Sequence, residues 1–153
     1  MSTLELKLPP PALALCIAFF MWWSSFFVGP INVPLAYRLG LALAIATIGT
    51  CIDVVAKLAF VRLNTSVNPL RPETASVLAS GGLYRFTRNP MYFGRALQLL
   101  GWATYLCNGI ALGLVLFFVA YITRFQILPE ERALSVRFGK EFAAYRMHVP
   151  RWV

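Results

Sequence analysis

The sequence predicts an all-α integral membrane protein with about four transmembrane helices and a C-terminal amphipathic helix on the cytoplasmic side. Two observations predict this fold class. Hydrophobic residues make up 59% of the 153 residues and charged residues only 13%, about half of the roughly 25% that is typical of soluble domains. The apolar residues also form segments long enough to span a bilayer. A single membrane domain over residues 1–153 is therefore expected, and the absence of a strand-rich region or a GxGxxG motif excludes a soluble dinucleotide-binding domain.

Four apolar segments are the predicted transmembrane helices. They cover about residues 12–28, 35–61, 91–107 and 110–128, and a spanning helix needs roughly 17–25 residues. Gly29-Pro30 and Pro34 predict a tight turn between the first two segments, and Asn108-Gly109 predicts another between the last two. The first segment is longer than a signal-peptide core of about 7–15 residues, and no small-x-small cleavage site follows it. We therefore expect a retained helix there.

The charges predict the orientation of these helices. The two tight turns carry no charged residue, whereas Lys and Arg surround the middle loop and fill the tail. These residues are Lys57, Arg62, Arg71, Arg85, Arg88 and Arg95 around the loop, and Arg132, Arg137, Lys140, Arg146 and Arg151 in the tail. The positive-inside rule then places both termini and the middle loop in the cytoplasm, as expected for a prokaryotic inner-membrane protein. The net charge of +8 is interpreted as this basic rim and not as a nucleic-acid site.

The tail is predicted to form one amphipathic helix over residues 131–145. Leu134, Phe138, Phe142 and Tyr145 recur at helical spacing, and charged residues fall largely elsewhere around the helix. Such a helix lies on the membrane surface or folds back over a site.

Two polar motifs lie at the same predicted end of the last two spans. Asn89-Pro90 begins the third span, with an N-cap residue followed by a favoured first helical residue. The exposed N–H groups there also suit a ligand carboxylate or phosphate. Pro129-Glu130-Glu131 begins the tail helix, where acidic residues are ordinary helix chemistry but are also suited to a ligand ammonium or a loop arginine. Both interpretations remain open for each motif.

Other polar residues within the spans have structural interpretations. Asp53 and Lys57 are four residues apart and predict an ion pair on one helix face. Gln98 is expected to bond a neighbouring helix, and Arg124 is placed so that it can snorkel to the interface. Three cysteines lie in apolar segments without a CxxC motif and are interpreted as small buried hydrophobic residues, and no metal site is expected.

A wider set of residues carries a resemblance to a known family. The set comprises Gly82-Leu83-Tyr84, Arg88-Asn89-Pro90-Met91-Tyr92-Phe93-Gly94, Glu130-Glu131, Phe138-Gly139, Tyr145 and Val149-Pro150-Arg151. It resembles the isoprenylcysteine carboxyl methyltransferase family, whose relatives include the phospholipid methyltransferases and other small prokaryotic membrane methyltransferases. The resemblance covers roughly residues 64–151. The loop motif, the helical hairpin and the Glu-Glu pair together are specific, although each part alone is weak.

The resemblance implies a methyltransferase that uses S-adenosyl-L-methionine and releases S-adenosyl-L-homocysteine, with the cofactor held on the cytoplasmic side. The loop 64–94 and the tail 129–151 would form the cofactor site. Carried over residue by residue, cofactor contacts fall on Val77, Leu78, Ala79, Tyr84, Asn89, Pro90, Met91, Tyr92, Glu130 and Glu131. The helix start at Asn89 suits the cofactor's carboxylate and Glu130 its ammonium group, while Tyr84 and Tyr92 offer aromatic faces to the adenine or the sulfonium.

The sequence departs from the named family at the acceptor side. Asn89 stands where the loop more usually has His, and the chain has fewer predicted spans than the eukaryotic enzymes. The isoprenylcysteine enzymes carry a substrate-facing Arg four residues before the first Glu, and this chain has Gln126 there, with Arg124 two residues earlier. Arg88, Arg124 and Gln126 are therefore the candidates for positioning the acceptor.

Three hypotheses for function follow. The first is a membrane methyltransferase acting on a lipid-like or isoprenoid-linked acceptor, similar to an isoprenylcysteine carboxyl O-methyltransferase. The second is N-methylation of a phospholipid amine. The third, of another class, is a non-catalytic four-helix membrane protein.

Overall fold

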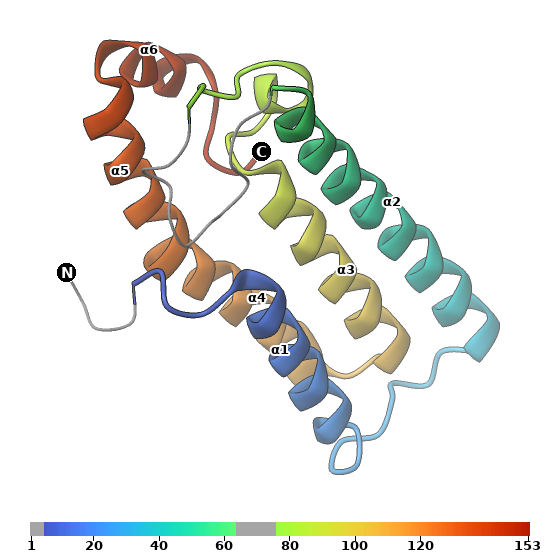
Figure 1. Ribbon diagram of the computed structural model, residues 1–153. Coiled ribbons are helices and arrows are strands. Elements are labelled where there is room, and N and C mark those ends of the chain that lie inside the picture. The colour runs from blue at the N-terminus through green and yellow to red at the C-terminus, as the bar shows by residue number, and fades with distance from the viewer. Residues whose placement is uncertain (1–4, 64–75) are drawn as a thin grey trace.

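The computed structural model describes residues 5–63 and 76–153, in which helices joined by turns and loops are the regular structure and no strand occurs. The predicted all-α fold class is therefore confirmed for this part of the chain (Figure 1). The elements are α1 (Pro10–Ser24), α2 (Leu35–Arg62), the short 3-10 helix η2 (Gly82–Arg85), α3 (Pro90–Leu106), α4 (Gly109–Ile122), the π-helical turn η3 (Thr123–Ile127), α5 (Leu128–Phe138) and α6 (Lys140–His148).

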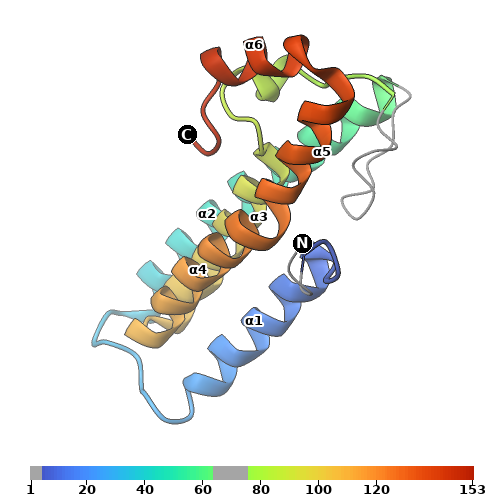
Figure 2. The same cartoon turned by 90° about the vertical axis from the view of Figure 1, so that its left-hand side faces the viewer.

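The helices run alternately up and down, so the chain's tight turns meet at one end of the molecule (Figures 1 and 2). The Ile31 N–H donates to the Cys107 carbonyl at 2.8 Å, which joins the turn before α2 to the turn before α4. Asn108 caps α4, because its side chain accepts the Ala111 N–H at 2.8 Å. The loop around η2 and helix α6 lie at the opposite end.

Glycine allows α2 and α3 to pack at very short range. A Cβ at Gly94 would lie 2.6 Å from the Gly49 carbonyl oxygen, and one at Gly101 would lie 2.8 Å from the Ala42 carbonyl oxygen. Neither distance is sterically possible, so only glycine fits. Small residues at such crossings let backbones approach closely, as in helix pairs within membranes.

The main apolar core lies between α1, α3 and α4. Met21, Ala103 and Phe118, one from each helix, are almost completely buried in it. The Trp102 Nε1–H also donates to the Ala18 carbonyl of α1 at 3.1 Å. Helix α2 is excluded from this core and packs along the other side of α3.

Two of the four predicted spans meet the criteria of length and apolar composition for crossing a membrane. These are α2, with 28 residues, and the continuous helix Gly109–Phe138, with 30. Only 22% and 33% of their most apolar windows are buried inside the protein, which is the opposite of what a soluble core helix requires. Helix α1 has 15 residues and α3 has 17, so four full spans are not confirmed. The predicted first span extends to residue 28, whereas α1 ends at Ser24 and residues 25–28 form a turn.

The prediction of a single tail helix over residues 131–145 is wrong. The fourth span continues through the π turn directly into α5, and Pro129 lies in the first turn of α5 without ending the helix. The break comes at Gly139, whose φ of +50° is left-handed and favours glycine. Helix α6 then begins as a separate element across the top of the molecule (Figure 1).

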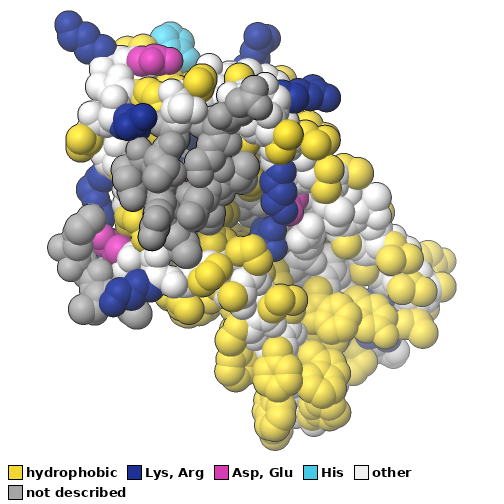
Figure 3. Space-filling view, in the orientation of Figure 1, with side chains coloured by type: hydrophobic (Ala, Val, Ile, Leu, Met, Phe, Trp, Pro, Cys, Tyr) yellow, Lys and Arg dark blue, Asp and Glu magenta, His cyan; other side chains and the backbone are white. Residues whose placement is uncertain are grey.

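The surface divides into an apolar part and a charged part (Figure 3). Hydrophobic side chains cover the lower half of the view, whereas most Lys and Arg side chains gather in the upper half. Large apolar side chains on the helices are exposed, for example Leu15, Leu116 and Phe117 at 74%, 71% and 54%. This distribution fits a chain that is surrounded by lipid at one end and has a basic rim at the other.

Candidate functional site

A polar cluster joins the first turn of α3 to the start of α5. The Tyr92 hydroxyl donates to Glu130 Oε1 at 2.5 Å, and Gln126 Nε2 donates to the same oxygen at 2.7 Å. Gln126 and Tyr92 are buried, with 3% and 9% of their surfaces exposed. No ion pair joins Glu130 to a cation within the described ranges. Among the residues that the structure describes, this carboxylate is therefore contacted by neutral donors alone.

Tyr84 lies near this cluster and belongs to a small apolar cluster of its own. It packs on Ala56 of α2 and Ala79 of the loop, with Met91 and Phe60 next to them. Its hydroxyl is buried and has no hydrogen-bond partner in the described structure. Burial raises the pKa of the Tyr84 phenol above its usual range, so the hydroxyl stays protonated. A buried, unpartnered hydroxyl is uncommon and needs an explanation.

The start of α3 differs from the expected N-cap. Asn89 has the N-cap position, but its side chain makes no capping hydrogen bond to the first turn. Its amide instead donates to the Arg151 carbonyl at 2.9 Å, and its own N–H donates to Thr87 Oγ1 at 3.2 Å. The predicted side-chain cap is therefore wrong: the Asn89 side chain is directed to the C-terminal tail, where its Nδ2 group donates to Arg151, and its oxygen accepts no N–H of the first turn. Pro90, which has no N–H, is the first residue of the helix.

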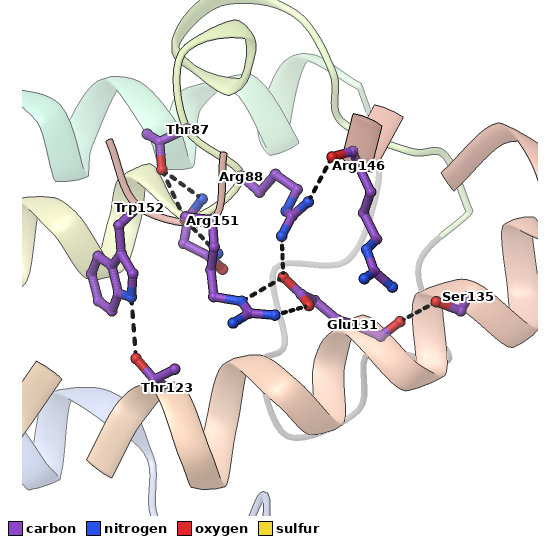
Figure 4. A network of polar contacts seen from close by, with 9 residues as sticks. Thr87, Arg88, Thr123, Glu131, Ser135, Arg146, Arg151 and Trp152 are labelled. Atoms are coloured by element: carbon purple, nitrogen blue, oxygen red, sulfur yellow. Dashed lines mark hydrogen bonds and ion pairs between the residues drawn. The ribbon is translucent and has the colours of Figure 1, made fainter. Parts of the chain in front are cut away.

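Glu131 is held by a network of arginines (Figure 4). Arg151 binds it through two parallel contacts, Nε to Oε1 at 3.0 Å and Nη2 to Oε2 at 2.8 Å. Arg88 adds a third contact to Oε1 at 2.9 Å and also donates to the Arg146 carbonyl at 3.2 Å. The Glu131 side chain is only 8% exposed. Both of its oxygens are thus already used inside the protein.

The C-terminal tail connects the loop to the end of the fourth span. The Arg88 N–H donates to the Pro150 carbonyl at 3.0 Å, and Thr87 Oγ1 donates to the Arg151 carbonyl at 3.1 Å. One residue later, Trp152 Nε1 donates to Thr123 Oγ1 of the π turn at 3.1 Å (Figure 4). The tail therefore lies between the first turn of α3 and helix α5, next to the polar cluster.

The remaining predicted site residues are distributed unevenly. Pro90 and Met91 lie with Tyr92 in the first turn of α3, and Leu78 is partly buried beside Ala79. Val77 is 44% exposed. Arg124 lies apart from the cluster: its side chain is 52% exposed and pairs with Glu5 at 3.0 Å. Arg124 and Gln126 are two residues apart and therefore point to different sides of their helix.

The ion pair and the interhelical hydrogen bond predicted within the spans are confirmed. Lys57 Nζ lies 2.6 Å from Asp53 Oδ2, and Arg95 of α3 reaches the same oxygen at 3.1 Å. Gln98 Nε2 donates to Thr50 Oγ1 of α2 at 3.1 Å. These contacts join α2 to α3 near the glycine crossing.

The prediction that the three cysteines are buried is wrong, because Cys16 and Cys51 lie on exposed helix faces and Cys107 is only partly buried.

Sequence reasoning missed four contributors to this region. They are Thr87, Arg151 and Trp152, which fix the tail, and Glu5, which contacts the fourth span. Arg151 belongs to the motif that carries the resemblance, but no local pattern connects it with Glu131, twenty residues earlier. Its partner is visible only after the chain folds.

The chain is similar to one protein family and to a known protein. A family model described as phospholipid methyltransferase matches residues 35–141. A protein of Haemophilus influenzae (strain ATCC 51907 / DSM 11121 / KW20 / Rd), described as an uncharacterized protein, is similar to this chain. It is 40% identical over 63 residues, which are 41% of this chain and all of that protein. No solved structure matches the chain.

Proposed function

Because the chain belongs to the phospholipid methyltransferase family, we propose that it is a membrane methyltransferase that uses S-adenosyl-L-methionine to methylate a lipid acceptor. Of the two kinds of acceptor that the sequence suggests, we favour the amine of a phospholipid. The single observation that carries the proposal is the Glu130 carboxylate, which is held in place by Tyr92 and Gln126 and has no cationic partner among the described residues.

The residues present fit the zwitterionic end of this cofactor. A carboxylate contacted only by neutral donors suits an ammonium group, because a charge-assisted hydrogen bond can form without displacing another cation. The first turn of α3 lies beside Glu130, has no side-chain cap, and suits a carboxylate. The buried Tyr84 hydroxyl would gain the partner it lacks. Glu131 is a poor second ligand, since Arg88 and Arg151 already occupy both of its oxygens.

The arginines argue for an amine acceptor over a carboxylate acceptor. A carboxylate acceptor requires an unpaired cation to orient it, as the Arg of the isoprenylcysteine enzymes would. In this chain that position is Gln126. The two neighbouring candidates each have a carboxylate partner: Arg88 pairs with Glu131 and Arg124 pairs with Glu5. An amine acceptor needs no such cation.

For methyl transfer the protein must align the acceptor with the methyl group and exclude water. When bound, the cofactor supplies an electrophilic methyl group. The acceptor amine would have to arrive uncharged, so that its nitrogen lone pair could form the bond to the methyl carbon while the carbon–sulfur bond broke with its electron pair on sulfur. The methylated amine would then lose its extra proton to solvent. Tyr92 and Gln126 orient Glu130, and the apolar packing around Tyr84 keeps water out.

The carboxyl O-methyltransferase remains the second candidate, because the motifs that carry the resemblance belong to both groups. A non-catalytic membrane protein is the alternative of another class. The two enzymes differ in the product they leave in the membrane: a methyl ester is released by mild base, whereas an N-methyl group is stable to it.

Binding and product analysis test the proposal. Calorimetry on the detergent-solubilised protein should show saturable binding of S-adenosyl-L-homocysteine, which Glu130→Ala and Tyr92→Ala weaken. The absence of binding at millimolar ligand would exclude both enzymes and favour the non-catalytic protein. Membranes incubated with radiolabelled cofactor should yield base-stable label in the phospholipid fraction. Base-labile label would reject the amine and support the carboxyl acceptor.

A further inference from the structure

The π turn determines which side chains of the fourth span face the site. Core residues of α4 recur every three or four positions until Ile122, and the next buried core residue, Ile127, comes after five. The Leu128 N–H donates to the Thr123 carbonyl, five residues back, as a π-helical turn requires. One extra residue in a turn rotates everything after it by about 100°. Glu130 therefore meets Tyr92 only because this turn is present.

Pro129 removes one hydrogen-bond donor from this helix, and the segment before α1 supplies a donor to the same carbonyl. Pro129 has no N–H, so it cannot bond the Phe125 carbonyl four residues earlier. The Leu6 N–H donates to that carbonyl at 3.1 Å. Leu6 has a φ of +57°, which is unusual for a residue other than glycine and is kept only where surrounding contacts require it.

Glu5 clamps the turn from the same segment. Its Oε1 accepts from Arg124, within the π turn, at 3.0 Å, and its Oε2 accepts from Arg132, beyond the turn, at 2.6 Å. The Glu5 side chain is 5% exposed, although both arginines are about half exposed. The hydrogen bond from Arg124, together with Arg132, lowers the pKa of Glu5, so the clamp stays charged at neutral pH. One carboxylate thus connects a residue of the irregular turn to the regular helix that follows.

We propose that Glu5 and Leu6 form a positioning element that holds the π turn and thereby fixes Gln126 and Glu130 against Tyr92. The element touches the outer side of the helix, and the polar cluster lies on the inner side. The element places Glu130 beside the Tyr92 hydroxyl, and this effect does not depend on what the site binds. Its consequence for ligand affinity rests on the proposed function.

Fluorine NMR of protein labelled with 3-fluorotyrosine tests the geometric part. Tyr92→Phe identifies the Tyr92 resonance, and Glu130→Gln shows how far it moves when the charged acceptor is lost. Glu5→Gln and Arg132→Gln should each move the Tyr92 resonance toward its position in Glu130→Gln. Lys7→Gln is the matched control, since Lys7 is an exposed residue of the same segment. An unchanged Tyr145 resonance shows that the fold is retained.

Ligand binding separates this inference from the proposed function. Glu5→Gln should weaken S-adenosyl-L-homocysteine about five- to tenfold, as expected when one well-placed hydrogen bond is lost, and Lys7→Gln should not. A Tyr92 resonance that Glu5→Gln leaves in place would overturn the positioning element even if the ligand binds. A resonance that moves in a protein that binds no ligand would support the positioning element and reject the proposed function.

Discussion

Two neighbouring carboxylates should respond in opposite ways to the same substitution. Glu131→Gln removes the charge that two arginines share, whereas Glu130→Gln changes a carboxyl group that, among the described residues, only neutral groups contact. We expect the first variant to lose stability and the second to lose ligand affinity. The substitutions are isosteric and lie one residue apart, so each is the control for the other.

The structure sets the size of the expected loss for Glu131→Gln. Removing one partner of a buried pair costs about 3–5 kcal/mol because the other charge stays buried. The Arg88 side chain is 10% exposed and meets that condition, but Arg151 is 32% exposed and can regain water. A loss of about 2–3 kcal/mol is therefore expected. For a chain of this length that lowers the melting temperature by about 5–10 °C.

Thermal unfolding in detergent, followed by circular dichroism, measures this shift, and calorimetry with S-adenosyl-L-homocysteine measures the affinity. The melting temperature of Glu130→Gln should stay within about 2 °C of that of the unmodified protein, since a glutamine oxygen can still accept the hydrogen bond from the Tyr92 hydroxyl. The reasoning is refuted if the melting temperatures of both variants fall by the same amount, or if Glu131→Gln melts at the same temperature as the unmodified protein.

Three further predictions concern the scaffold. Gly94→Ala should separate α2 from α3 and lower the melting temperature clearly, whereas Gly113→Ala, which meets no atom within 4 Å, should not; equal effects would contradict the close crossing. Asp53→Asn should lower the free energy of unfolding by about 2–4 kcal/mol, because the mostly buried charge of Arg95 then has no partner in this pair. Unfolding in detergent measures this loss, and Lys57→Gln should have a smaller effect. Burial raises the pKa of Tyr145 to about 12, so the unfolded chain loses this proton first and stability should fall between about pH 10 and 12. Tyr145→Phe should flatten that fall, and an identical pH profile in both proteins would exclude the assignment.

Much of the fold could be predicted from local composition. The apolar runs placed α2 within a residue of its observed end, and the Asn108-Gly109 signal placed the turn before α4. Proline was misleading at position 129, where the helix continues, because the π turn and the Leu6 N–H compensate for the missing hydrogen bond. The break occurs ten residues later, at Gly139.

The site was predictable as a set of residues but not as an arrangement. The loop motif and the Glu-Glu pair indicated that the start of α3 and the start of α5 meet, and Tyr92 and Glu130 do meet there. The sequence placed both Glu130 and Glu131 among the cofactor contacts and assigned Glu130 to the ammonium group, but it also left open a loop arginine as a partner for this pair. Arg88 was expected to act toward the acceptor. The geometry confirms the loop arginine as the partner of Glu131, which Arg88 binds together with a tail arginine that no local pattern could assign.

By itself the sequence determined an apolar helical chain with its basic residues gathered at one end, because helix formation and burial in lipid depend on local composition and period. Only the tertiary structure decided which of two adjacent carboxylates is available to a ligand. Adjacent side chains on a helix point about 100° apart, so their surroundings depend on the rotation of the helix. In this protein that rotation is fixed by one extra residue in a π turn and by contacts from Glu5 and Trp152, at opposite ends of the chain.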